Sequence, residues 1–405
     1  MTSTHQSPPR TAPLYAVLAF TALNSFAAGT TSTGIFFVTR NAYEFSATAN
    51  YGLGLLFGLG YTIGALASGP LLRRIRAAFP TLSSRGLLAL VVGTLSLLCA
   101  LPVLLPSPST VWAMLGVYAA ICGMLWPIVQ TYLSGGRAAG DLQRAVGVFN
   151  LTWSSTLVVS FWLIAPVLKS HPLAVLGAVA LVHLASFAFL VPLGREPGTT
   201  PQVSAEAPAA VSKSFLVAHR VLLASAYLVM YALIPFLPTL LDDIGVARLW
   251  QTPLTSTWLI TRVVTFYLLL RSPRWRGRNW PAIAGTACMV AGFALTVLAS
   301  WWDARAIAIA QFALGLAAFG VGVAVLYFAA LFYALEAGRA KVDAGGRHEA
   351  MIGAGYTFGP LCGLVAYEAA ALGWIAPTAA DPCMLAGVFA FTVIGIVAAL
   401  RVARR

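Results

Sequence analysis

The stretch GREPGTTPQVSAEAPAAVSK, from Gly194 to Lys213, crosses the middle of the 405-residue chain and decides how the rest is interpreted. It is the one long segment rich in Pro, Ser, Thr and charge, whereas both flanking halves consist mainly of apolar runs. Runs of roughly 20 to 25 apolar residues match the helix length that crosses about 30 Å of hydrocarbon. We therefore predict a polar linker, 194–213, between two membrane-embedded bundles, 1–193 and 214–405.

The composition excludes a soluble globule. The chain is 59% hydrophobic and only 9% charged, with a mean hydropathy of +0.84, so few polar groups remain to cover a water-exposed surface. The net charge of +13 does not indicate a nucleic-acid partner, because the basic residues fall between apolar runs and form no patch with interleaved aromatic residues. The five cysteines have no spacing typical of a metal or disulfide framework. We predict no cofactor and no metal.

The apolar runs predict an all-α polytopic membrane protein with twelve spans. They are 14–38, 47–72, 87–105, 111–133, 142–168 and 173–192 in the first half, and 214–241, 250–270, 281–301, 304–335, 350–372 and 384–402 in the second. With this count most Lys and Arg residues fall on one side of the membrane, which by the positive-inside rule places both termini in the cytoplasm. We expect a monomer in the cytoplasmic (inner) membrane of a bacterium.

Two similar strings, RAVGVFNLTW (144–153) and EAMIGAGYTF (349–358), open the fifth span of each half and suggest an internal repeat. With six plus six spans, a central linker and cytoplasmic termini, the chain resembles the major facilitator superfamily, and it does so over its whole length. The family motif between spans two and three is degenerate here, because GPLLRRIR (69–76) has Arg73 where the acid belongs. The span-five motif of the drug and proton antiporters of the family is absent, which disfavours that function.

Arg262 is the one Lys or Arg near the middle of a predicted span, and a charge at that depth usually faces a polar interior. The resemblance implies that span eight borders a central cavity. Arg262 would then hold an anionic group of the cargo, with Trp258 packed on its apolar part. Alternatively, backbone carbonyls or a distant carboxylate neutralise Arg262, which then only pins helices together. We expect no Asp or Glu at matching depth, so proton coupling is unsupported, and His183 is either a relay or a packed histidine.

Further candidates for cargo contact are the polar and aromatic side chains of the spans that the resemblance turns inward. They are Asn24, Gln130, Asn150, Trp153, Tyr231 and Tyr327. Each could instead form hydrogen bonds between helices, because an unpaired polar group is costly within a membrane.

Charges near the cytoplasmic ends of the spans suggest an inner gate. Arg73 and Arg74 end span two where Glu349 opens span eleven, and Arg271 and Arg274 end span eight where Asp141 precedes span five. We expect ion pairs between these sets when the carrier faces outward. Alternatively, these charges only set the topology and are solvated among lipid headgroups.

Together these features predict a transporter of a small organic solute, with an anionic group, that works by alternating access, either facilitative or secondary active. One alternative is an exporter of apolar or amphipathic compounds such as drugs or lipids. A multispan membrane enzyme should show a cluster of His, Asp, Glu or Cys, and His348 beside Glu349 has no obvious third partner. We therefore predict no enzyme, while a non-transporting sensor remains open.

Overall fold

The computed structural model describes residues 11–137, 139–198, 210–336 and 342–403, which form fifteen α-helices joined by short π and 3-10 segments. The first half contains α1 (Leu14–Gly29), a π segment (Thr30–Gly34), α2 (Ile35–Tyr43), α3 (Ala47–Ala78), α4 (Ser84–Leu104), α5 (Pro108–Ser134), α6 (Ala139–Ser170), α7 (Ala174–Ala185) and a 3-10 turn (Ser186–Phe189). The second half contains α8 (Ala210–Leu233), α9 (Leu237–Asp243), α10 (Arg248–Thr255), α11 (Thr257–Arg271), α12 (Trp280–Val297), α13 (Arg305–Glu336), α14 (Val342–Ala371) and α15 (Ala380–Ala403), with 3-10 turns at Pro273–Trp275, Leu298–Trp301 and Pro377–Ala379.

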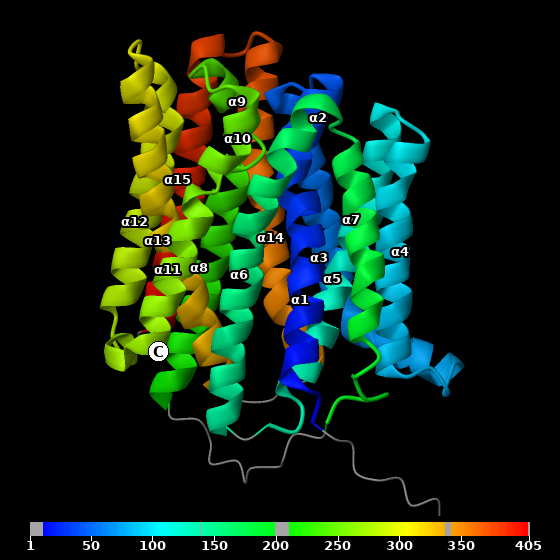
Figure 1. Cartoon of the computed structure of the whole chain (residues 1–405). Coiled ribbons are helices and arrows are strands. Elements are labelled where there is room, and N and C mark those ends of the chain that lie inside the picture. The colour runs from blue at the N-terminus through cyan, green and yellow to red at the C-terminus, as the bar shows by residue number, and fades with distance from the viewer. Residues whose placement is uncertain (1–10, 138, 199–209, 337–341, 404–405) are drawn as a thin grey trace, which may run out of the picture.

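The predicted all-helical, polytopic fold is confirmed. Within the described ranges, 11 helical stretches are long and apolar enough to cross a membrane, and the shorter apolar stretch Ala174–Phe189 supplies the remaining predicted crossing. Figure 1 shows the start of α1 and the end of α15 at the same end of the bundle, as an even number of crossings requires. We call this the terminal end and the opposite one the α2/α9 end. That the terminal end faces the cytoplasm stays a prediction from the charges.

Three spans that the sequence predicted as continuous are interrupted, and one of them is the seventh, 214–241, which is divided at 234–236 between α8 and α9. The first span contains the π segment, where the Thr31 hydroxyl donates to the Ala27 carbonyl. The eighth is divided at Ser256 into α10 and α11, three residues after Pro253, which has no backbone N–H to donate. Hydropathy alone does not detect such breaks, because serine, threonine and neighbouring helices satisfy the freed backbone groups.

The start of α14 corrects the sequence analysis most. The helix begins at Val342, eight residues before the predicted start of span eleven at residue 350. Arg347 and His348 are polar, so the apolar run in the sequence begins only after them. His348 and Glu349 are nevertheless buried, and polar groups that face the protein interior are tolerated in a span. Glu349 therefore lies two turns inside the helix. Helix α8 also begins inside the predicted linker, at Ala210, and 199–209 lie outside the described residues.

The two halves lie side by side, with α6 and α14 near the boundary between them (Figure 1). Helix α3 packs against α14, and α6 packs against α10 and α11. The α3–α14 contact depends on small residues, because a Cβ added at Gly58 would collide with the backbone of Tyr356. Close approach of helix backbones at glycine is a common way to pack membrane helices. The bounds of the two domains stay a prediction.

We expect Gly58→Ala to lower the melting temperature of the purified protein, because the added methyl group would separate α3 from α14. Overpacking of this kind costs about 1–3 kcal/mol. The control is Gly93→Ala on α4, where an added Cβ would make an ordinary 3.6 Å contact with the ring of Phe187. A thermal-shift measurement in detergent checks both variants. Equal melting temperatures for Gly58→Ala and Gly93→Ala would contradict the close packing.

Candidate functional site

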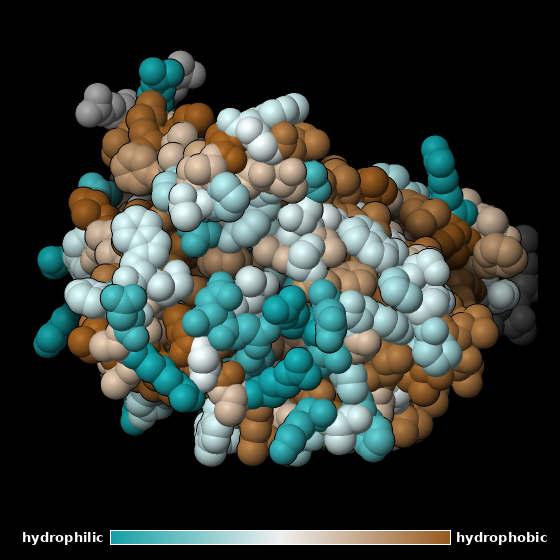
Figure 2. Space-filling model, turned by 90° about the horizontal axis from the view of Figure 1, so that it is seen from above, coloured by the Kyte–Doolittle hydropathy of each residue, from teal (hydrophilic) through white to brown (hydrophobic). Residues whose placement is uncertain are grey.

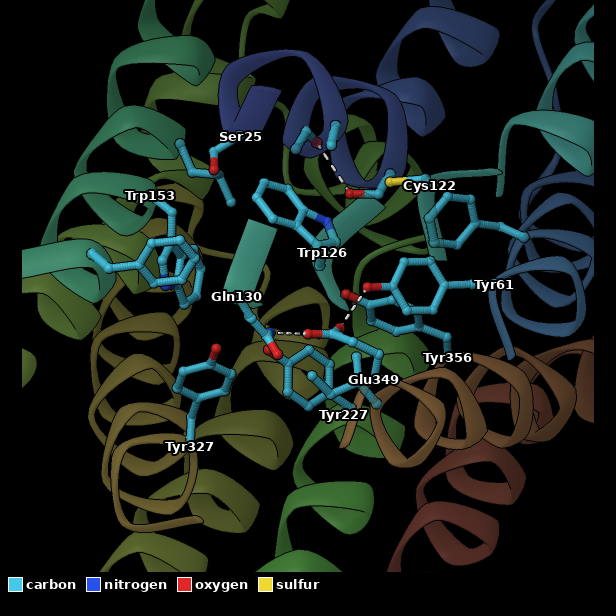
Figure 3. Close-up of a pocket in the computed structure, with 17 residues that line it drawn as sticks. Ser25, Tyr61, Cys122, Trp126, Gln130, Trp153, Tyr227, Tyr327, Glu349 and Tyr356 are labelled. Carbon is cyan, nitrogen blue, oxygen red and sulfur yellow. Dashed lines mark hydrogen bonds between the residues drawn. The ribbon is translucent and has the colours of Figure 1, made fainter. Parts of the chain in front are cut away.

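A cavity of about 110 Å³ lies between the two halves. A single buried water needs about 10–15 Å³ on this measure, so the space accommodates several waters or one compact solute. Helices α1, α3, α5 and α6 line it from the first half, and α8, α13 and α14 from the second (Figure 3). The lining residues are Ser25, Ala28, Gly29, Ser32, Phe57, Tyr61, Cys122, Trp126, Gln130, Phe149, Trp153, Leu157, Tyr227, Tyr327, Glu349, Ile352 and Tyr356.

Among the described residues that line the cavity, Glu349 is the one carboxylate, and none is a Lys or Arg. Its side chain is directed into the space in Figure 3, and the residue is only 5% exposed. The Tyr61 hydroxyl donates to Oε2 at 2.7 Å, and Nε2 of Gln130 donates to Oε1 at 2.8 Å. Both donors are neutral and come from the first half, so the carboxylate of α14 bridges the two bundles through hydrogen bonds.

Aromatic rings from both halves form the rest of the wall around this carboxylate. The ring of Tyr356 lies 5.2 Å from that of Tyr61 and 5.3 Å from that of Tyr227, centroid to centroid. On another side, the Trp153 ring lies 5.3 Å from Tyr327 in an edge-on arrangement. A solute in the cavity therefore meets ring faces and edges, two kinds of contact that bind apolar and cationic groups.

Arg262 lies outside the cavity lining, although the residue is only 2% exposed. Its guanidinium carbon lies 4.4 Å from the centroid of the Trp153 ring and 4.6 Å from that of Trp258. Nε donates to the Ser154 hydroxyl at 3.0 Å, while Nη2 has no hydrogen-bond partner among the described residues. The arginine thus joins α6 to α11 as a cation held between two tryptophans, and Trp153 contacts both this cation and the cavity.

Of the eight predicted cargo-contacting residues, the structure brings Gln130, Trp153 and Tyr327 to the cavity. The other five lie outside its lining and are Asn24, Asn150, Tyr231, Trp258 and Arg262.

The polar residues outside the lining make bonds within the protein. The Trp153 indole donates to Asn150 at 2.9 Å, and the Tyr231 hydroxyl donates to the Ser32 carbonyl at 3.1 Å. Asn24 bonds to Nδ1 of His183, whose Nε2 lies 3.1 Å from the Tyr118 hydroxyl. His183 is accordingly a packed, hydrogen-bonded residue, the second of the two alternatives for it.

Three tyrosines of the cavity wall were not predicted from the sequence, namely Tyr61, Tyr227 and Tyr356. A signal for Tyr227 was present, because it lies four residues before the candidate Tyr231 on the same helix. No comparable signal marks Tyr61 or Tyr356, since only the packing of α3 against α14 brings their rings together.

The predicted gate pairs do not form in this structure. Both oxygens of Glu349 accept from neutral groups, so neither Arg73 nor Arg74, which are exposed on α3, is its partner. The reason is the early start of α14, which places Glu349 inside the bundle rather than at its end.

The second predicted gate contact does not form either between the described residues in this conformation. Within the described part of the chain, no ion pair joins the exposed Asp141 to Arg271 or Arg274. A role for these residues in another conformation of the protein stays a prediction.

We expect Arg262→Met to keep most of the stability of the protein and Arg262→Ala to lose about 2–5 kcal/mol. Methionine retains contact with both tryptophans and removes a buried charge that has no counter-ion among the described residues, whereas alanine leaves a cavity. Thermal unfolding of the two variants in detergent checks this. An equally large loss in Arg262→Met would show that the charge itself, rather than the packing, holds α6 to α11.

No protein-family model and no curated protein sequence matches the chain. Solved structures do match it in fold. The nucleoside transporter NupG aligns with a TM-score of 0.68 at 12% sequence identity, over 96% of this chain and 98% of that one. A bacterial homologue of the human lysosomal transporter Spinster, in an inward-facing and occupied conformation, aligns with a TM-score of 0.67 at 15% identity, over 96% of both chains. The chain therefore has the fold of the major facilitator superfamily of transporters.

Proposed function

We propose that the chain is a membrane transporter that carries a small organic solute by alternating access, as a facilitator or as a secondary active carrier. The observation that carries the proposal is the cavity lined by both halves, since a shared central site is what the rocking of two bundles exposes in turn. The two similar structures named above are transporters and not enzymes, which agrees with this function.

The α2/α9 end is held closed by an ion pair between the halves. Nε of Arg40 on α2 donates to Oδ2 of Asp242 on α9 at 2.8 Å, and Nε2 of Gln251 donates to Oδ1 of the same carboxylate at 2.8 Å. Both charged side chains are 30% exposed. Figure 2, which looks onto this end, shows hydrophilic side chains gathered across its middle. We call Arg40, Asp242 and Gln251 together the α2/α9 latch.

Further contacts close the same end of the molecule. The Trp162 indole on α6 donates at 3.0 Å to the hydroxyl of Ser256, the residue at the break between α10 and α11. The Tyr51 hydroxyl on α3 donates at 2.9 Å to the Ala232 carbonyl near the end of α8. Alternating access requires these contacts to separate as a group, which a rigid-body rotation of one bundle against the other would achieve.

The size of the cavity bears on the cargo. A space of about 110 Å³ accommodates a compact solute, so in this conformation the export of a large lipid or drug is the less supported alternative. The sequence prediction of an anionic cargo relied on Arg262, which lies behind Trp153. A monomeric state and a location in the inner membrane of a bacterium stay predictions.

We expect Asp242→Asn to weaken the α2/α9 latch and to make the cavity more accessible from that end. Cys122 lines the cavity and serves as the reporter in a variant whose other four cysteines are replaced. A membrane-impermeant maleimide added to the expected extracellular side should label it faster by about 1.5- to 5-fold, the factor that corresponds to 0.2–1 kcal/mol for a partly exposed ion pair.

The matched control for this experiment is Asp243→Asn. Asp243 is the adjacent acid, is exposed and forms no ion pair among the described residues. The control should label at the unmodified rate. Labelling of Cys122 that is unaffected by Asp242→Asn, or raised equally by both variants, would contradict a closed gate at this end.

A further inference from the structure

We propose that the cavity selects a small organic cation, with Glu349 as its counter-ion and the surrounding rings as its apolar contacts. The inference rests on the proposed function and adds to it the chemical class of the solute. It replaces the anionic cargo predicted from the sequence, because the charged group that lines the cavity is a carboxylate and not the arginine.

The first argument is the charge balance of the cavity wall. A carboxylate withdrawn from water is costly unless an opposite charge or enough hydrogen bonds stabilise it. Glu349 has two hydrogen bonds, both from neutral donors, and the cavity lining contains no Lys or Arg to balance it. The site therefore has one uncompensated acidic group, and a cation that enters the cavity would supply the missing charge.

The second argument is the surface around the carboxylate. Tyr227 and Tyr356 lie beside Glu349 in Figure 3, and Trp126 and Tyr327 face the same space. The π faces of Trp and Tyr attract ammonium groups, and a desolvated contact of this kind contributes about 2 kcal/mol or more. A carboxylate among such rings favours an organic cation, whose charged group carries carbon substituents, over a small hydrated metal ion.

The third argument concerns the one buried arginine nearby. Arg262 would attract an anion if it reached the cavity, but its guanidinium is held between Trp153 and Trp258 and bonded to Ser154. The ring of Trp153 contacts Arg262 and also lines the cavity, so an anion in this space would meet the indole and the carboxylate instead. The two buried charges thus have separate environments.

Binding would also connect the two halves. Glu349 belongs to α14 of the second half, while its two donors, Tyr61 and Gln130, belong to α3 and α5 of the first. A cation seated against the carboxylate would contact rings from both bundles. The conformation seen here, which is closed at the α2/α9 end, would accordingly be more stable with the solute than without it.

Three probes of one shape but different charge test the inference on the purified full-length protein. They are choline, its uncharged isostere 3,3-dimethylbutanol and the anion 3,3-dimethylbutyrate. We expect choline to raise the melting temperature with a saturable dependence on concentration. The alcohol should need at least roughly tenfold more ligand, a difference of about 1.4 kcal/mol, and the anion should give no shift.

Variants assign the effect to the carboxylate. Glu349→Gln should remove the preference for choline over the alcohol. Glu349→Asp retains the charge, so it should keep this preference with a weaker affinity, and it tests the inference even if Glu349→Gln does not fold. The matched control is Glu368→Gln near the α2/α9 end of the same helix, an exposed acid outside the lining, which should behave as the unmodified protein does.

Several results would overturn the inference. A larger shift with the anion, equal shifts with all three probes, no shift with choline, or a choline preference that survives Glu349→Gln would each do so. Failure here is separable from failure of the proposed function, because labelling of Cys122 from the α2/α9 side reports the movement of the halves without any ligand.

Discussion

A carboxylate within a bundle of apolar helices is stable only if the protein itself supplies its partners, and this constraint shapes the centre of the molecule. Glu349 projects from α14 toward the opposite half, where the Tyr61 hydroxyl and the Gln130 amide bond to its two oxygens. Those bonds form only if α3 and α14 approach closely, which Gly58 permits. This buried carboxylate therefore also helps to hold the two halves together.

The second buried charge is accommodated in a different way. Arg262 has one hydrogen bond from Nε and two tryptophan faces, which is an arrangement suited to a permanent cation with weak hydration. Glu349, in contrast, lies against open space. One charge is enclosed by packing between α6 and α11, while the other remains available to a solute. The difference in environment, rather than depth in the membrane, separates the packed charge of Arg262 from the cavity-lining charge of Glu349.

Hydropathy and the distribution of basic residues predicted the number of crossings and the helical fold, because the length of apolar runs is a property of the sequence alone. They did not predict where α14 begins, since the polar run around His348 ends an apolar window even when those side chains face protein. The separation of Arg262 from the cavity depends on the orientation of Trp153, which only the packing of α6 against α11 determines. Polar residues such as Asn24 were recognisable as needing partners, but their partners lie on other helices.

The central claim is that the two halves open alternately around the cavity, and distances measured between spin labels in a lipid bilayer test it most directly. One label pair replaces the exposed Glu44 and Arg248 at the α2/α9 end, and a second pair replaces the exposed Arg74 and Arg271 at the terminal end. The account predicts two distance populations for each label pair. When a ligand or a latch variant changes their proportions, the longer distance at one end should accompany the shorter distance at the other. A single distance at both ends that no ligand or latch variant alters would contradict it.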